Sequence, residues 1–253
     1  MIGVLNTRPQ EQAASLSNSL RAAGYLPFEV PLVELVLNPE QLERLEVLAL
    51  QANGFLLSSP TLISRIQLTG KSSLKACLLS KPWYLISQQA QTQVEAMGGK
   101  VAYTAKEPSL KGLLSELSQY KGLELLHLCS TETRLDPLVF AEHGIKVLNV
   151  PCYSPICPEQ SPGALATNWN KLQAVLFASG SAVENLFKVA PELGQSLGTA
   201  SGPIPFSIGP SATEALQRWG ISPFYQSPTP DNAGFISGLN QIFKSPTHPE
   251  ENR

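Results

Sequence analysis

The stretch that decides the fold is Pro205-Phe206-Ser207-Ile208-Gly209-Pro210-Ser211-Ala212-Thr213-Glu214-Ala215-Leu216. Its apolar start predicts a short strand, and Gly209-Pro210 predicts that the strand ends and a helix begins. Ser211 and Glu214 have the S-x-x-E spacing of a capping box, as do Ser181 and Glu184, so we expect Ser211 and Ser181 to be N-caps. A helix start presents N–H groups and partial positive charge, which suit an anion. A well-capped helix that binds no ligand would have the same pattern.

The rest of the chain repeats this unit of strand, polar loop and helix. Apolar runs predict further strands at 3–8, 26–36, 54–57, 83–86, 101–104, 124–129, 146–150, 174–177 and 223–226. Pro31 marks the second run as an edge strand or a linker, and Pro151-Cys152-Tyr153-Ser154-Pro155 predicts a break in regular structure. Alternation at this pace is typical of a parallel α/β sheet. The polar, Pro-rich residues 244–253 are expected to be a disordered tail.

The second half of the chain echoes the first. Residues 82–117 align without a gap on 204–239, an offset of 122, and share identical residues such as Gly98 with Gly220 and Tyr103 with Tyr225. Residues 54–63 fall on 174–183 at an offset of 120. A repeat of this length is too long for a solenoid, and it predicts two similar α/β domains.

Composition excludes several classes of protein. The chain has 253 residues, is 43% hydrophobic and 15% charged, and carries a net charge of −2, so we expect an ordinary soluble globule that does not bind nucleic acid. It has no apolar run of about 18 residues and no basic start followed by an apolar segment, which favours a cytoplasmic location. The four cysteines and three histidines are scattered. We therefore expect no metal site and no disulfide.

Small and hydroxyl-bearing residues follow the predicted strands, where the ligand crevice of a parallel sheet lies. Capping alone explains each of these loops, whereas their shared composition favours an anion-rich ligand. The candidates are Thr7, Arg8, Ser58, Ser59, Ser87, Gln88, Gln89, Ser130, Ser179, Gly180, Ser181, Gly209, Pro210 and Ser211.

No standard nucleotide motif and no G-x-S-x-G elbow occurs in the chain. Tyr153 is the candidate catalytic residue, because a phenol in the Pro-flanked segment could donate a proton or a hydrogen bond to a ligand. The alternative is that Tyr153 is an aromatic packing residue with a satisfied hydroxyl.

Several of these stretches together resemble the uroporphyrinogen-III synthase family. The matching residues are Leu5-Asn6-Thr7-Arg8-Pro9, Leu57-Ser58-Ser59-Pro60, Val150-Pro151-Cys152-Tyr153, Phe177-Ala178-Ser179-Gly180-Ser181-Ala182, Ile208-Gly209-Pro210-Ser211 and Pro228-Thr229-Pro230. The likeness runs to about residue 243, and it adds Thr229 to the candidate substrate-binding residues.

The resemblance implies a fold of two similar parallel-sheet α/β domains, interleaved in sequence and joined by a two-stranded β-ladder. Domain one would be 1–34 with 157–243, and domain two would be 37–149. The linker strands would be 31–36 and 150–156.

The resemblance also implies the activity. Hydroxymethylbilane, a linear tetrapyrrole with eight carboxylates, would be cyclised with inversion of ring D and loss of water to give uroporphyrinogen III, a step of tetrapyrrole and haem biosynthesis. The enzyme would be a hydro-lyase that needs no cofactor or metal, with Tyr153 assisting departure of the hydroxyl. It would be a monomer, in transient contact with the preceding pathway enzyme.

The sequence departs from the family pattern at a few positions. Ala90 and Ala212 stand where the family often has Thr, Ser87-Gln88-Gln89 replaces a Gly-containing turn, and Cys129-Ser130 stands where Arg-Gly is frequent. The alternative function is therefore a non-catalytic two-lobed protein that senses a tetrapyrrole or another polyanion. A periplasmic-type binding protein is disfavoured because no signal peptide is recognisable.

Overall fold

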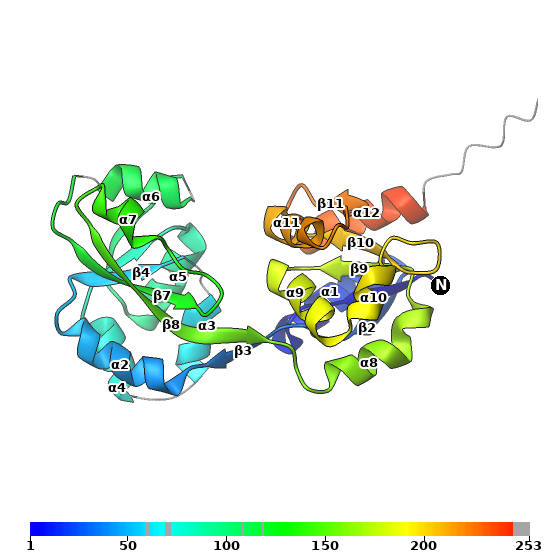
Figure 1. Cartoon of the computed structure of the whole chain (residues 1–253), viewed down its shortest axis with the longest axis horizontal. Helices are drawn as coiled ribbons and strands as arrows, with labels where there is room; N and C mark the ends of the chain where they lie inside the picture. The colour runs from blue at the N-terminus through cyan, green and yellow to red at the C-terminus, as the bar shows by residue number, and fades with distance from the viewer. Residues whose placement is uncertain (59–60, 69–71, 108, 118, 245–253) are drawn as a thin grey trace, which may run out of the picture. The chain divides into compact units, whose positions relative to one another are not determined.

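The computed structural model describes residues 1–58, 61–68, 72–107, 109–117 and 119–244. Contacts within the chain divide it into two compact units, one of Met1–Glu34 with Ile156–Arg253 (unit 1) and one of Leu35–Pro155 (unit 2; Figure 1). Apart from Lys244, the expected tail at 244–253 lies outside the described residues. Within the described ranges, no helix is long and apolar enough to cross a membrane.

Unit 1 is built on a five-stranded parallel sheet with the strand order β11-β10-β9-β1-β2. Its strands are β1 (Gly3–Asn6), β2 (Leu26–Glu29), β9 (Ala174–Phe177), β10 (Ile204–Ser207) and β11 (Tyr225–Gln226). Its helices are α1 (Gln10–Ala22), α8 (Ser161–Asn168), the short 3-10 helix η1 (Trp169–Lys171), α9 (Gly180–Val189), α10 (Pro191–Ser196), α11 (Pro210–Arg218) and α12 (Asn232–Phe243).

Unit 2 is built on a six-stranded sheet with the order β3-β8-β7-β4-β5-β6. Its strands are β3 (Glu34–Leu37), β4 (Gly54–Leu57), β5 (Trp83–Leu85), β6 (Val101–Thr104), β7 (Glu124–Ser130) and β8 (Lys146–Ile156). Its helices are α2 (Pro39–Ala49), α3 (Thr61–Leu68), α4 (Ser72–Leu79), α5 (Gln88–Met97), α6 (Leu110–Leu117) and α7 (Pro137–Ala141). From β8 to β6 the strands pair in parallel, and the predicted parallel α/β fold is confirmed.

The two sheets share one topology. The order β11-β10-β9-β1-β2 of unit 1 corresponds strand for strand to β6-β5-β4-β7-β8 of unit 2. The sequence repeat gives the same correspondence, since β4 falls on β9 at the offset of 120 and β5 and β6 fall on β10 and β11 at 122. Equivalent positions in the two units can therefore be compared directly.

Apolar residues at strand and helix spacing form the cores. In unit 2 one face of the sheet packs Phe55 and Trp83 under α2, α3, α4 and α5, with the two rings 5.0 Å apart. The other face packs Leu56 and Phe140 under α6 and α7 (Figure 1). In unit 1 the helical spacing of Leu16 and Leu20 in α1 places both side chains in the core.

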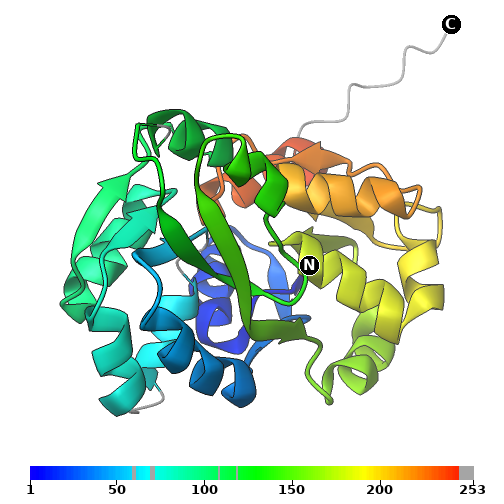
Figure 2. The ribbon, with the colours of Figure 1, turned by 60° about the vertical axis from the view of Figure 1, so that its left-hand side comes forward.

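The structure corrects two predictions about proline. The run at 26–36 is not one strand but two, β2 and β3, which belong to different sheets and are separated at Pro31. Conversely, β8 does not break at Pro151 but continues to Ile156 (Figure 2). Pro151 lies opposite Cys129, and the register between β7 and β8 shifts directly after that pair. A proline has no N–H for the ladder, so an irregularity at this pair lets the strand continue.

Candidate functional site

Parallel pairing gathers the candidate residues at the carboxyl edge of each sheet. In unit 1 the loops after β10, β9 and β1 are neighbours, and they carry Gly209-Pro210-Ser211, Ser179-Gly180-Ser181 and Thr7-Arg8. The loop after β11 adds Thr229. In unit 2 the corresponding neighbours β5, β4 and β7 end at Ser87-Gln88-Gln89, Ser58 and Ser130. Ser59 lies outside the described residues.

The start of α9 is capped by Ser179, whose hydroxyl accepts a hydrogen bond from the N–H of Ala182 at 3.2 Å. Gly180 follows, and a Cβ atom at this position would lie 3.0 Å from both the carbonyl and the hydroxyl oxygen of Ser211. The first turns of α9 and α11 therefore lie in direct contact. A larger residue at position 180 would require the start of α11 to shift.

The structure overturns both predicted capping boxes. Pro210 is the first residue of α11 and Gly209 is its N-cap, so Ser211 lies inside the helix and does not cap it. Ser181 likewise lies inside α9, because Ser179 is the N-cap. Glu184 accepts hydrogen bonds from Arg218, the shorter at 2.8 Å, instead of turning back to the helix start. Proline suits the first helical position because its φ is preset and its missing N–H is not needed there. The helix α11 therefore begins at Pro210, before Ser211.

No side chain of the described residues caps α11, and its regular bonding begins with the N–H of Thr213 donating to Gly209. The N–H groups of Ser211 and Ala212 precede that bond, and such groups at a helix start have no partner within the helix. Together with the helix dipole they form a site suited to a carboxylate.

The start of α5 is the equivalent place in unit 2. Ser87 caps it by accepting from the N–H of Ala90 at 3.3 Å, and the side chains of Gln88 and Gln89 are exposed. Ala90 and its counterpart Ala212 are each 1% exposed, so both methyl groups point into the core.

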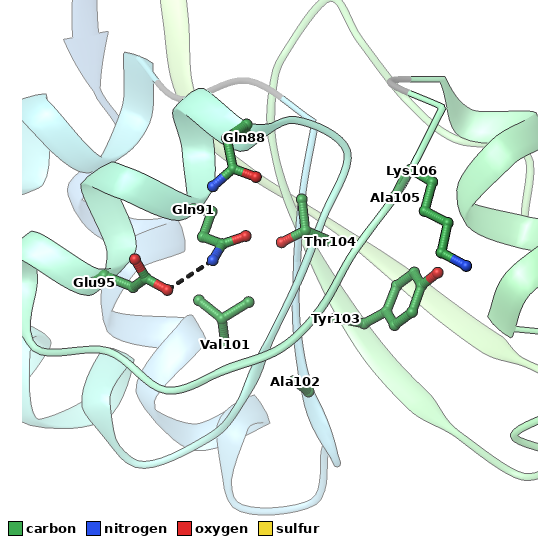
Figure 3. A pocket seen from close by; sticks show the side chains of 9 residues that line it. All are labelled: Gln88, Gln91, Glu95, Val101, Ala102, Tyr103, Thr104, Ala105 and Lys106. Atoms are coloured by element: carbon green, nitrogen blue, oxygen red, sulfur yellow. Dashed lines mark hydrogen bonds between the residues drawn. The ribbon is translucent and has the colours of Figure 1, made fainter.

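A pocket of about 560 Å³ runs from Gln88 along the groove between α5 and β6 (Figure 3). Within it, the side chain of Gln91 donates to Glu95 at 2.8 Å, and the Thr104 hydroxyl faces Gln91. The Thr104 hydroxyl oxygen is buried and has no hydrogen-bond partner among the described residues. In unit 1 the equivalent pair, Thr213 and Gln226, is closed by a hydrogen bond of 2.6 Å. The open groove of unit 2 therefore extends the candidate site along α5.

Arg8 is the cation at the carboxyl edge of unit 1. Its guanidinium donates to the side chain of Asn232 at 2.7 Å. Burial lowers the pKa of Arg8, and the nearby Asp231 carboxylate acts in the opposite direction. Asp231 caps α12, and the Gly234 N–H is the main cause that lowers the pKa of this carboxyl, followed by the hydroxyl of Thr229. Arg8 and Thr229 are thus tied to one helix start.

Two of the candidates, Thr7 and Tyr153, are buried. The side chain of Thr7 is fully buried, and its hydroxyl donates to the carbonyl of Leu176 at 2.7 Å, which joins β1 to β9. Tyr153 is 8% exposed, lies opposite Ser130 at the end of β7, and packs in the apolar cluster of unit 2. Its carbonyl accepts from the N–H of Thr131 at 2.9 Å. The Thr7 side chain therefore stabilises the sheet and is not available to a ligand, whereas Tyr153 lies at the carboxyl edge.

The family model described as uroporphyrinogen-III synthase HemD matches residues 14–237 of this chain. The chain belongs to the uroporphyrinogen-III synthase family. A uroporphyrinogen-III synthase from Synechococcus elongatus is 25% identical over 229 residues, which cover 85% of each chain.

Solved structures of the same family share the fold. A mutant uroporphyrinogen III synthase from Thermus thermophilus matches with a TM-score of 0.64 at 19% identity, covering 96% of this chain and 99% of that one. The uroporphyrinogen-III synthetase of Helicobacter pylori matches with a TM-score of 0.63 at 16% identity, covering 96% and 100%.

The sequence did not point to His127 and Asn149, which this member of the uroporphyrinogen-III synthase family brings together beside Ser58. Nε2 of His127 lies 2.9 Å from the hydroxyl of Ser58, and Nδ1 lies 2.8 Å from the side-chain oxygen of Asn149. His127 is fully buried within the strand predicted at 124–129. A polar residue inside an otherwise apolar strand was the signal available.

The helix starts can be tested through stability. Replacing Ser179 with Ala removes a real N-cap and should lower the free energy of unfolding by about 1 kcal/mol. Ser211→Ala, inside α11, should change it by less than about 0.5 kcal/mol. Urea unfolding of both variants measures the difference, and equal losses would contradict the assignment of Gly209 as the N-cap.

Proposed function

We propose that this chain catalyses the cyclisation of hydroxymethylbilane to uroporphyrinogen III, with inversion of ring D and loss of water. The observation that carries the proposal is the family match over residues 14–237. The chain is then an enzyme of tetrapyrrole biosynthesis, and the reaction makes it a hydro-lyase. We further propose that it acts in the cytoplasm as a monomer and meets the preceding pathway enzyme transiently.

The substrate carries eight carboxylates, and the carboxyl edges of both sheets offer groups that bind carboxylates. The proposed contacts are the first turns of α5, α9 and α11, together with Arg8 and Thr229. Backbone N–H groups at helix starts bind anions without a dedicated cation, which suits a chain of net charge −2. Thr7 is left out of this proposal because its side chain lies in the core.

The proposed chemistry begins when the C–O bond of the hydroxymethyl group breaks and the hydroxyl leaves, with a proton, as water. The electrophilic carbon that remains bonds to the substituted carbon of ring D and gives a spiro intermediate. That intermediate fragments and recloses with ring D inverted, and a proton leaves. Every electron pair comes from the substrate, so no cofactor is required. The protein contributes mainly by holding the reacting carbons in the correct orientation.

Tyr153 is the proposed donor to the departing hydroxyl. Tyr153 pairs with Ser130, the last residue of β7, at the carboxyl edge of unit 2, and it is 8% exposed. A phenol held away from water gives a stronger hydrogen bond to developing negative charge than the same group in water. A phenol can assist this departure by donating a hydrogen bond to the leaving oxygen.

The non-catalytic alternative rested partly on the missing hydroxyls at Ala90 and Ala212. Both methyl groups are buried, the Ser87 cap beside Ala90 is present, and the first backbone N–H groups of α11 beside Ala212 remain. The two substitutions therefore do not favour loss of activity.

The decisive assay supplies freshly prepared hydroxymethylbilane to the protein and separates the isomers formed. We expect mainly uroporphyrinogen III, at a rate above that of the spontaneous reaction. If only the type I isomer forms, at the uncatalysed rate, the proposed function is wrong.

Tyr153→Phe should lower kcat by about tenfold or more, with the affinity for uroporphyrinogen III nearly unchanged, because only the phenolic hydroxyl is removed. The matched control is Tyr25→Phe. Tyr25 directly precedes β2, and its hydroxyl donates to the side chain of Asn240 at 2.9 Å. The control should keep full kcat. Unchanged kcat in Tyr153→Phe would assign Tyr153 to packing alone.

A further inference from the structure

A chain of hydrogen bonds crosses three strands of unit 2 and ends at the carboxyl edge. Asn149 on β8 lies directly opposite His127 on β7, and Ser58 follows the end of β4. The distances are 2.8 Å from Asn149 Oδ1 to His127 Nδ1 and 2.9 Å from His127 Nε2 to Ser58 Oγ. These hydrogen bonds join the fully buried side chain of His127 to Ser58, which is partly exposed.

The orientation of the Asn149 amide is fixed by Leu135. The N–H of Leu135 donates to Asn149 Oδ1 at 3.1 Å, and Asn149 Nδ2 donates to the carbonyl of Leu135 at 2.8 Å. Reversing the amide would lose both bonds. The atom that faces His127 Nδ1 is therefore an oxygen, which can only accept, so Nδ1 carries the proton.

The protonation of His127 follows from this arrangement. Burial lowers the pKa of His127, and its hydrogen bond with Asn149 opposes that shift without reversing it. The imidazole is therefore neutral at neutral pH, with its proton on Nδ1 and a lone pair on Nε2. The Ser58 hydroxyl must donate its proton inward to Nε2.

Unit 1 shows that the fold does not require the hydrogen bonds from Asn149 through His127 to Ser58. Ala178 is the counterpart of Ser58 (178 − 58 = 120), and it has no hydroxyl. Asn6 is the counterpart of His127, since it pairs with Leu176 as His127 pairs with Leu56. Asn6 binds the carbonyl of Ala13 and the hydroxyl of Ser17 instead. The link to an edge hydroxyl is therefore specific to unit 2.

The serines at the two carboxyl edges differ in what they offer a ligand. Ser87 and Ser179 accept hydrogen bonds from backbone N–H groups, so each keeps its own proton to donate to a carboxylate. Ser58 has already committed its proton to His127, and outward it presents only lone pairs. A carboxylate would repel those lone pairs, whereas an N–H group complements them.

We propose that Ser58 accepts a hydrogen bond from a pyrrole N–H of the linear tetrapyrrole, with His127 and Asn149 as positioning residues. The inference rests on the proposed function. Pyrrole N–H groups are the donors that the substrate backbone carries, and its ionised side chains can only accept. Ser87 and Ser179 would donate to carboxylates, whereas Ser58 would accept from a pyrrole N–H. This difference would distinguish the pyrrole backbone from its carboxylates and fix the orientation of the bound tetrapyrrole.

The kinetic test uses the full chain and hydroxymethylbilane. Ser58→Ala should raise KM about three- to tenfold with kcat nearly unchanged. The reason is that the variant loses one neutral hydrogen bond, which is made equally in the ground and transition states. Ser58→Thr keeps the hydroxyl and should restore KM. The control Ser73→Ala removes a hydroxyl that donates to Glu46 on the exposed surface of unit 2, and it should have no effect.

Either an unchanged KM in Ser58→Ala or a fall in kcat at constant KM would overturn the inference. If wild-type protein forms no type III isomer, the proposed function fails and this inference fails with it. If wild type forms it and Ser58→Ala behaves as wild type, only this inference fails.

A second measurement does not depend on any variant at Ser58. Imidazole ¹⁵N spectra of the wild-type protein, with His127→Gln for assignment, report which ring nitrogen carries the proton. We expect a neutral ring protonated on Nδ1. A ring protonated on Nε2 would overturn the inference, because the Ser58 proton would then be free to point outward.

Discussion

Parallel hydrogen bonding of β10, β9 and β1 in unit 1, and of β5, β4 and β7 in unit 2, constrains where a site can form. It brings the carboxyl ends of strands that are far apart in sequence to one edge, so β1 lies beside β9 across about 170 residues of chain. Each following helix begins beyond that edge, and the N–H groups of its first turn have no backbone partner within the helix. The candidate residues therefore share an edge because of backbone pairing alone.

The consequence for function is that much of the proposed binding relies on backbone groups. Ser87 and Ser179 cap their helices, Gly209 leaves α11 uncapped, and Gly180 allows two helix starts to touch. Backbone N–H groups persist through most substitutions, which is consistent with the low identities to family members that share the fold. Side chains are needed only where chemistry or polarity must be specified, as we propose for Tyr153 and Ser58.

The sequence predicted the parallel α/β class because apolar strands are local patterns, and it predicted the internal repeat because aligning the sequence with itself gives the offsets of 120 and 122. It placed the N-caps of α9 and α11 two residues late, at Ser181 and Ser211, because the S-x-x-E spacing at each helix start competes with Ser179 in α9 and with Pro210 in α11. It misread Pro151, since the tolerance of β8 for proline depends on a register shift opposite Cys129. His127 and Asn149 were missed because their pairing joins positions 22 residues apart.

The central claim is that backbone groups at the carboxyl edges hold the carboxylates of a tetrapyrrole. Amide ¹⁵N–¹H spectra of the labelled protein, titrated with uroporphyrinogen III without oxygen, test it most directly. The account predicts that the largest shifts occur in the first turns of α5, α9 and α11, at Gln89, Gly180 and Ala212 among others. Shifts confined to the amino edges of the sheets, or absent from these first turns, would contradict it.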